Sequence, residues 1–261
     1  MARKKKSSSN RLEVQNATKT LFANIGFMSP DLPIHTIVMT SSVPSEGKST
    51  TSIELARAIA SSGKSALLVE ADMRRRSLAN YLGVRAQAGV YSVLTNAVPL
   101  ERAIVSTKIN NLSFLDAEPN IPNPVDIVSS KSYERLVNDL EKKFDYVIFD
   151  TAPVGTFVEG AILSGLVDGT ILVVRVGMTK RAELQHAYEQ LKKAKANILG
   201  TCATFCEESS NEYYYAYYTK EGRRVEDNFG SMPSVSNGAG SRRVSGGQGA
   251  DIPTSEIKGG R

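Results

Sequence analysis

The sequence predicts a doubly wound α/β domain with a mainly parallel sheet in a three-layer, Rossmann-like arrangement. Short, continuously apolar runs, typical of strands buried on both faces, alternate with longer helical stretches. A Gly-Lys-Ser-Thr turn directly follows the first apolar run and opens the first helix after it. With 41% hydrophobic and 23% charged residues, the 261-residue chain is of ordinary globular composition and long enough for a sizeable core.

The predicted elements follow one another in regular order. A helix is expected over residues 12–27, and the two prolines within 28–33 end it. Strands are expected at 34–40, 65–71, 112–115, 146–150, 170–176 and 197–203. Helices are expected between them at 49–62, 131–143, 158–166 and 180–194.

The composition divides the chain into five predicted segments. These are a basic flexible arm (1–11), an N-terminal helix and linker (12–33), the phosphate-loop domain (34–206), a tyrosine cluster (207–218) and a Gly/Ser-rich tail (219–261). Residues 219–261 contain no leucine. Because so little apolar surface cannot offset the entropy of ordering, we expect this tail to be disordered.

Positive charge is concentrated at the N-terminus. Of the formal net charge of +5, all five charges lie before Glu13, so the rest of the chain sums to zero. Such an arm is either a solvated terminus or attracted to anionic lipid, and no nucleic-acid partner is expected. No apolar run reaches the ~20 residues needed to span a bilayer. We therefore expect a cytoplasmic protein that reaches the inner face of the membrane through a partner or the arm.

The strongest motif runs from Thr40 to Thr50, between a strand and a helix. In such a loop the backbone amides and the helix N-terminus cradle phosphates, Lys48 neutralises their charge and the Ser49 hydroxyl ligates Mg²⁺. Gly47 lets the backbone approach the ligand closely. The alternative interpretation of the whole motif is a capped helix that follows a Ser-rich turn and binds no phosphate. The predicted ATP contacts are Pro44, Ser45, Glu46, Gly47, Lys48, Ser49 and Thr50.

Three acids end two other predicted strands: Glu70 and Asp72 follow one, and Asp150 ends another. Because the carboxyl ends of parallel strands meet where ligands bind, these acids are expected to face the phosphates. Asp150 would hold Mg²⁺ through water, Asp72 could share that role, and Glu70 would be a general base or another metal-side carboxylate. The alternative is that any of them caps the following helix. The predicted catalytic set is Lys48, Glu70, Asp72 and Asp150, and the predicted metal ligands are Ser49, Asp72 and Asp150.

Taken together, the motifs Ser41–Thr50, Leu67–Arg75 and Asp145–Asp150, with the tyrosine cluster, resemble the bacterial tyrosine kinases of the capsular and exopolysaccharide type. The resemblance covers residues 11–218 and implies a P-loop protein-tyrosine autokinase that uses ATP and Mg²⁺. It also implies regulation of polysaccharide synthesis and export, with a membrane co-polymerase as activator in trans, a phosphorylation-sensitive homo-oligomer and a cognate tyrosine phosphatase. The implied acceptors, phosphorylated in trans, are Tyr213, Tyr214, Tyr215, Tyr217 and Tyr218.

Several positions depart from the family pattern. Glu70 stands for the usual Asp, Arg76 for Pro and Ser45 for a loop Gly. The charged helix motif that helps to close a ring of subunits aligns with Asn16, Lys19 and Phe22, and Thr204 replaces an Asn that reads adenine.

Two other functions stay open from the sequence. The departures at Glu70 and in the N-terminal helix favour a weakly active or non-catalytic ATP-binding scaffold that responds to phosphorylation. The second open function is that of a positioning ATPase of the partitioning and cell-division class. Val43 speaks against it, because that class has its signature lysine at this position. Phosphotyrosine on the tail would separate kinase from positioning ATPase, and dependence on Lys48 would separate kinase from scaffold.

Overall fold

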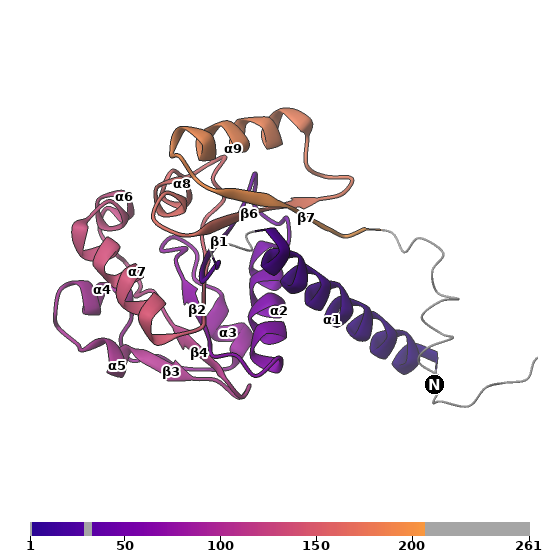
Figure 1. Ribbon diagram of the computed structural model, residues 1–261, viewed down its shortest axis with the longest axis horizontal. Coiled ribbons are helices and arrows are strands. Elements are labelled where there is room, and N and C mark those ends of the chain that lie inside the picture. The colour runs from indigo at the N-terminus through magenta and orange to yellow at the C-terminus, as the bar shows by residue number, and fades with distance from the viewer. Residues whose placement is uncertain (1, 29–32, 207–261) are drawn as a thin grey trace, which may run out of the picture. The chain divides into compact units, whose positions relative to one another are not determined.

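The computed structural model describes the backbone of residues 2–28 and 33–206, and the side chains from residue 11 onward in those ranges. The predicted tyrosine cluster and Gly/Ser-rich tail lie outside the described residues. The described part is built on a seven-stranded sheet with strand order β3-β4-β2-β5-β1-β6-β7 (Figure 1). The fold class predicted from the sequence is confirmed.

Six of the strands run parallel and β3 pairs antiparallel at one edge. β1 lies between β5 and β6, so the phosphate loop starts near the middle of the sheet. In chain order the strands are β1 (Thr36–Ser41), β2 (Ala66–Glu70), β3 (Ile104–Ser106), β4 (Leu112–Leu115), β5 (Tyr146–Asp150), β6 (Gly169–Arg175) and β7 (Ile198–Thr204).

Helices cover both faces of the sheet (Figure 1). Successive strand residues point to opposite faces: Ile37 and Met39 of β1 pack with α1, α2 and α3, whereas Val38 between them packs with α4 to α8. This two-sided burial explains the continuously apolar strands. The helices are α1 (Ala2–Met28), α2 (Lys48–Ser61), α3 (Leu78–Leu82), α4 (Val90–Leu94), α5 (Leu100–Ala103), α6 (Pro124–Val128), α7 (Lys131–Lys143), α8 (Glu159–Ser164) and α9 (Arg181–Lys193).

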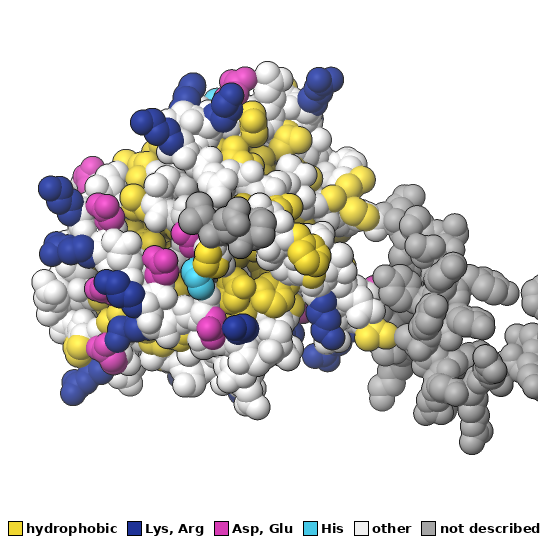
Figure 2. All heavy atoms as spheres, in the orientation of Figure 1, with side chains coloured by type: hydrophobic (Ala, Val, Ile, Leu, Met, Phe, Trp, Pro, Cys, Tyr) yellow, Lys and Arg dark blue, Asp and Glu magenta, His cyan; other side chains and the backbone are white. Residues whose placement is uncertain are grey.

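The described surface carries both signs of charge, as the face in Figure 2 shows, with apolar side chains exposed between them. This agrees with the neutral charge balance of the chain outside residues 1–11.

Helix α1 differs from its prediction at its start. It begins at Ala2, so the backbone of residues 2–11 continues the helix and does not form a separate arm. Towards its end, α1 contacts α2 and buries Ile25 in the core. Phe22, which stands where the resemblance implies a charge, sets its ring edge-on against Tyr146 at 5.2 Å between centroids. The aromatic substitution therefore helps to attach α1 to the domain.

Five short elements escaped the sequence analysis: α3, α4, α5, β3 and α6. Each has three to five residues, which is too short for a hydrophobic period to register. The start of α4 is held by Glu118, whose carboxylate accepts the N–H groups of Gly89, Tyr91 and Ser92 at 2.8 Å. Because Glu118 lies 26 to 29 residues from the N–H groups that it accepts, the local sequence pattern gave no signal of this helix.

The buried hydroxyl of Tyr133 allows a prediction about the free energy of unfolding. Tyr133 of α7 is fully buried, and its hydroxyl has no hydrogen-bond partner among the described residues. We expect Tyr133→Phe to raise the free energy of unfolding by about 1 kcal/mol, because it removes an unsatisfied hydroxyl and keeps the ring. Urea unfolding measures the change. The packing control Leu140→Ala, on the same helix, should lower it by about 2 to 5 kcal/mol, and a Tyr133→Phe loss of similar size would contradict the prediction.

Candidate active site

The predicted phosphate loop occupies the carboxyl end of β1. The strand ends at Ser41 and α2 begins at Lys48, so residues 42–47 form the turn between them. Gly47 stands at the N-cap with φ +90°, a conformation that L side chains rarely adopt. The free backbone N–H groups of the first turn of α2 face outward at this point and no acid stands in that turn. The loop therefore has the geometry of an anion cradle.

The side chain of Glu46 is turned back into its own loop. It is buried, and its carboxylate accepts the Val43 N–H at 2.8 Å and the Thr179 hydroxyl. The same Thr179 oxygen accepts the backbone N–H of Arg175 at 2.9 Å. These bonds satisfy both carboxylate oxygens of Glu46 and attach the loop to the segment after β6. Because the Glu46 side chain is occupied by these bonds, only the backbone of Glu46 could make the predicted contact with the nucleotide.

Two further contacts join the loop to the last strands. Thr204 of β7 donates its hydroxyl to the Glu46 carbonyl oxygen at 2.6 Å, and its side chain packs against Gly47. Arg175 donates to the Ser45 carbonyl oxygen at 3.3 Å and stacks over the Phe205 ring at 3.9 Å. Pro44 and Ser45 remain exposed. Sequence reasoning missed the roles of Thr179 and Arg175, because they lie about 130 residues from the loop.

Lys48 and Asp150 form a buried ion pair beneath the loop. The Lys48 Nζ lies 2.8 Å from Asp150 Oδ1 and 3.3 Å from the Ser49 hydroxyl, and Ser52 donates to the same Asp150 oxygen at 2.8 Å. Asp150 Oδ2 is buried without a hydrogen-bond partner among the described residues. The loop lysine and the acid at the end of β5 therefore lie in direct contact.

Glu70 lies beside Asp150, because the two residues are register partners at the ends of β2 and β5. Its Oε2 accepts the N–H groups of Ser77 and Leu78 at 2.7 and 2.9 Å, so it caps α3. Its Oε1 is buried without a partner in the described part of the chain. Burial raises the pKa of Glu70 to about 8, and the negative charge of Asp150 adds to this shift.

Asp72 begins the turn that follows β2. Its Oδ1 accepts the N–H groups of Arg74 and Arg75 at 3.1 and 2.8 Å. Arg74 in turn donates twice to Glu159 Oε1, at 2.9 and 2.6 Å, and lies 4.4 Å from the centroid of the Phe157 ring. The turn after β2 is therefore connected to the segment that follows β5.

The donor set fits a nucleotide with Mg²⁺. Ser42 Oγ, Asp150 Oδ2 and Glu70 Oε1 are buried oxygens without partners among the described residues. Within the same residues, no three His, Cys, Asp or Glu side chains form a ready metal cage. Mg²⁺ bound with phosphates needs only one or two carboxylates, since substrate oxygens and water complete its shell. Of the predicted metal ligands, Asp150 and Ser49 both lie within 3.3 Å of the Lys48 Nζ, whereas Asp72 bonds within the turn after β2.

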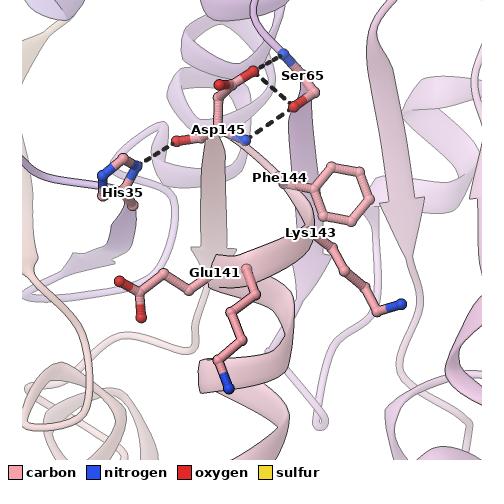
Figure 3. A pocket seen from close by; sticks show the side chains of 7 residues that line it. His35, Ser65, Glu141, Lys143, Phe144 and Asp145 are labelled. Atoms are coloured by element: carbon pink, nitrogen blue, oxygen red, sulfur yellow. Dashed lines mark hydrogen bonds between the residues drawn. The ribbon is translucent and has the colours of Figure 1, made fainter.

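A recess at the amino ends of the strands, opposite the phosphate loop, does not contain a comparable set of buried acids and bases among the described residues. It is lined by His35, Ser65, Asp145 and residues 141–144 at the amino ends of the strands (Figure 3). Asp145 Oδ2 already accepts the N–H and the hydroxyl of Ser65 at 2.7 and 2.8 Å, and the His35 ring contacts the Asp145 carbonyl oxygen. These bonds connect the starts of neighbouring strands and serve the fold.

The fold and the loop define a P-loop nucleotide-binding domain, and residues 34–198 match the family described as AAA domain. Tyrosine-protein kinase YwqD of Bacillus subtilis (strain 168) is 33% identical over 203 residues, which cover 78% of this chain and 86% of that protein. Tyrosine-protein kinase CpsD of Streptococcus pneumoniae is 32% identical over 190 residues, covering 72% and 84%. The chain belongs to the bacterial tyrosine-protein kinases.

Solved structures agree with this assignment. The crystal structure of the chimerical protein CapA2B2 is 30% identical, covers 71% of this chain and 82% of its own, and has a TM-score of 0.68. The septum site-determining protein MinD from Pyrococcus horikoshii, complexed with Mg-ADP, is 24% identical with a TM-score of 0.56, covering 64% and 68%. Because that identity is below 25%, the likeness shows the fold alone, and the kinase relatives are the nearer ones.

The raised pKa of Glu70 makes stability depend on pH. Because the folded pKa of about 8 exceeds the unfolded value of 4.5, the protonated carboxyl stabilises the fold fully below pH 4.5, and this contribution is lost as the pH rises to 8. We expect Glu70→Gln to flatten the decline between pH 5 and 8, whose slope is at most about 1.4 kcal/mol per pH unit. Urea unfolding at pH 5, 6.5 and 8 without nucleotide or Mg²⁺ tests this. The exposed control Glu101→Gln should keep the decline, and an unchanged decline in Glu70→Gln would contradict the prediction.

The bond between Thr179 and Glu46 predicts an effect on nucleotide binding. Thr179→Val leaves one Glu46 oxygen buried without its donor and frees the end of the loop, at a cost of about 1 to 3 kcal/mol in stability. We expect the Kd for ATP to rise severalfold, as measured by isothermal titration calorimetry. Thr179→Ser keeps the hydroxyl and should retain the parent affinity. Equal affinities for the Val and Ser variants would show that the loop does not depend on this bond.

Proposed function

We propose that this tyrosine-protein kinase uses ATP and Mg²⁺ to phosphorylate tyrosines of its own C-terminal region and thereby regulates the synthesis and export of a capsular or exopolysaccharide. The observation that carries the proposal is the convergence of Lys48, Asp150 and Glu70 at the N-terminus of α2. The acceptors, which lie outside the described residues, would be Tyr213, Tyr214, Tyr215, Tyr217 and Tyr218.

The loop would bind the nucleotide through backbone groups. The amides of residues 44–50 and the positive end of α2 would contact the β- and γ-phosphates. Lys48 would add its charge there, and Asp150 with Ser52 sets the direction of its approach. Ser49 and Asp150 would hold Mg²⁺, which when bound neutralises charge on the phosphates, whereas Asp72, the third predicted ligand, is the acid that an acceptor tyrosine would reach. These residues do no covalent chemistry, so their contribution is position and electrostatics.

The acids differ in their access to an incoming tyrosine. Glu70 and Asp150 are 0% exposed, whereas Asp72 is 8% exposed at the start of the turn. We therefore assign to Asp72 the contact with the acceptor hydroxyl, where it orients the phenol and receives its proton as the phosphoryl group is transferred. Glu70, which caps α3 through Ser77 and Leu78, would hold the turn that carries Asp72 in place.

The expected partners follow from the family. A tyrosine on the C-terminal region of one subunit would enter the site of another, and phosphates added within six residues would repel one another and loosen the oligomer. A membrane co-polymerase would activate the kinase in trans, and a cognate tyrosine phosphatase would reset it. No helix among the described residues is long and apolar enough to cross a membrane. We place the protein in the cytoplasm at the inner face of the membrane, where that partner would bind it.

A second candidate function rests on Glu70. Its carboxyl group is fully buried and one of its oxygens caps α3, so it would not reach an incoming tyrosine in the place of the family's usual Asp. This favours a weakly active ATP-binding scaffold whose tyrosines are phosphorylated by another kinase.

Intact mass and site mapping after incubation with Mg²⁺ and ATP test the proposal. We expect several phosphates on the parent chain, all between Tyr213 and Tyr218, and none on Lys48→Met. Because Lys48→Met leaves Asp150 buried without its cation, at a cost of about 3 to 5 kcal/mol, circular dichroism must show that the variant is folded. The exposed control Lys64→Met, at the opposite edge of the sheet, should be phosphorylated like the parent.

A parent chain that stays unphosphorylated with a candidate activator segment added, yet binds ATP, would favour the scaffold. Phosphates elsewhere than in the tyrosine cluster would contradict the proposed acceptors.

A further inference from the structure

Three consecutive arginines follow Asp72, and only two of them are paired with acids in the described structure. Arg74 donates twice to Glu159, and Arg76 donates through two nitrogens to the carboxylate of Asp116. The Arg75 side chain is exposed and has no acidic partner among the described residues. Among the described residues, Arg75 is therefore the arginine of this turn whose charge is not paired with an acid.

Arg75 is held directly beside the acid assigned to the acceptor hydroxyl. Its backbone N–H donates to Asp72 Oδ1 at 2.8 Å. The flanking ion pairs, Arg74 with Glu159 and Arg76 with Asp116, attach the turn to α8 and to the end of β4. The ion pairs of Arg74 and Arg76 therefore fix the backbone position of Arg75, and its side chain extends from there into solvent.

The carboxyl edge of the sheet carries more acids than bases near this turn. A negatively charged peptide would meet repulsion there, and the phosphates of a bound nucleotide would add to it. An exposed cation beside Asp72 would offset this repulsion where an acceptor tyrosine reaches that acid. Besides Glu70, whose raised pKa favours its neutral form, the acids are Asp72, Asp116, Glu118, Asp150 and Glu159, and the bases that face them are Lys48, Arg74 and Arg76.

The chain's own acceptor segment has the complementary charge. Residues 207–218 contain Glu207, Glu208 and Glu212 together with the five tyrosines, and the first base after them is Lys220. We propose that Arg75 is a specificity-determining residue, which recognises acidic side chains next to the acceptor tyrosine in the segment of a second copy of this chain. The inference rests on the proposed function and names the substrate class of the same site: tyrosines preceded by acids.

Peptide binding tests this without requiring phosphoryl transfer. The full chain is used with its five cluster tyrosines changed to Phe and Glu207, Glu208 and Glu212 changed to Gln, so that its own segment does not compete. The probe is a fluorescent peptide of residues 207–218, measured by anisotropy with ADP and Mg²⁺ at low salt. Matched probes carry Gln or Lys in place of the three Glu. Because exposed charge pairs are weak and screened by salt, we expect the Kd to rise about 3- to 10-fold for Arg75→Ala.

Charge reversal gives the sharper comparison. Arg75→Glu should lose the acidic peptide and gain the Lys peptide, and Arg75→Lys should keep most of the affinity. The control Arg102→Glu, at an exposed arginine of α5, should bind all three peptides as the parent does. Equal affinity of the parent for the acidic and Gln peptides, or an equal loss in Arg102→Glu, would overturn the inference. A changed affinity for a fluorescent ATP analogue in Arg75→Ala would also overturn it, because Arg75 would then act on the nucleotide.

The same peptides distinguish this inference from the proposed function. Charge-selective binding by Arg75, with no phosphate transferred by the chain that carries Arg75 and Lys48, would contradict autokinase activity and support acidic-peptide recognition. Transfer at equal rates to all three peptides would support the kinase and overturn the role of Arg75.

Discussion

The ion pair between Lys48 and Asp150 is the interaction on which the site depends. It joins the start of α2 to the end of β5, and the neighbouring acid Glu70 makes a cation necessary there. Two buried carboxyl groups side by side repel each other when both are charged, so the lysine and the proton on Glu70 keep the arrangement stable. The lysine that neutralises Asp150 in this way stands in the first turn of α2, the end of a helix that favours anions.

The phosphate loop is held from the side of the last two strands. Thr179, Thr204 and Arg175 each bond to residues 45–46, so the loop conformation depends on the ends of β6 and β7. This explains how an acid can stand within an anion-binding loop, because both oxygens of the Glu46 carboxylate already accept hydrogen bonds, from Val43 and Thr179. It also explains how Ser45 keeps a φ of +69°, which is uncommon for a residue other than glycine. The chain leaves the described domain just after Thr204 and Phe205, beside this loop.

Four of the positions that depart from the family pattern make side-chain contacts of their own. Glu70 is one methylene longer than Asp, and its Oε2 reaches the amides that open α3. Arg76, in place of Pro, pairs with Asp116 and connects two strand ends. Phe22 replaces a charge and packs against Tyr146. Thr204, in place of an Asn, bonds to the phosphate loop and does not present its hydroxyl to a base. These substitutions are accommodated by the fold, and the site keeps its lysine and its acids.

The sequence by itself determined six of the seven strands, the helices of more than five residues, the phosphate loop and the acids at the ends of β2 and β5. Those features follow from local signals: apolar runs, helical periods and a Gly-Lys-Ser turn after a strand. Only the tertiary structure decided that Glu46 bonds to Val43 and Thr179, that Glu70 caps α3 and that Arg75 stays unpaired within the described residues while Arg74 and Arg76 do not. The partners in these bonds lie up to 133 residues away in the chain. A carboxylate or a guanidinium group takes its role from whichever donor or acceptor the folded strands bring within 3 Å, and that pairing has no period along the sequence.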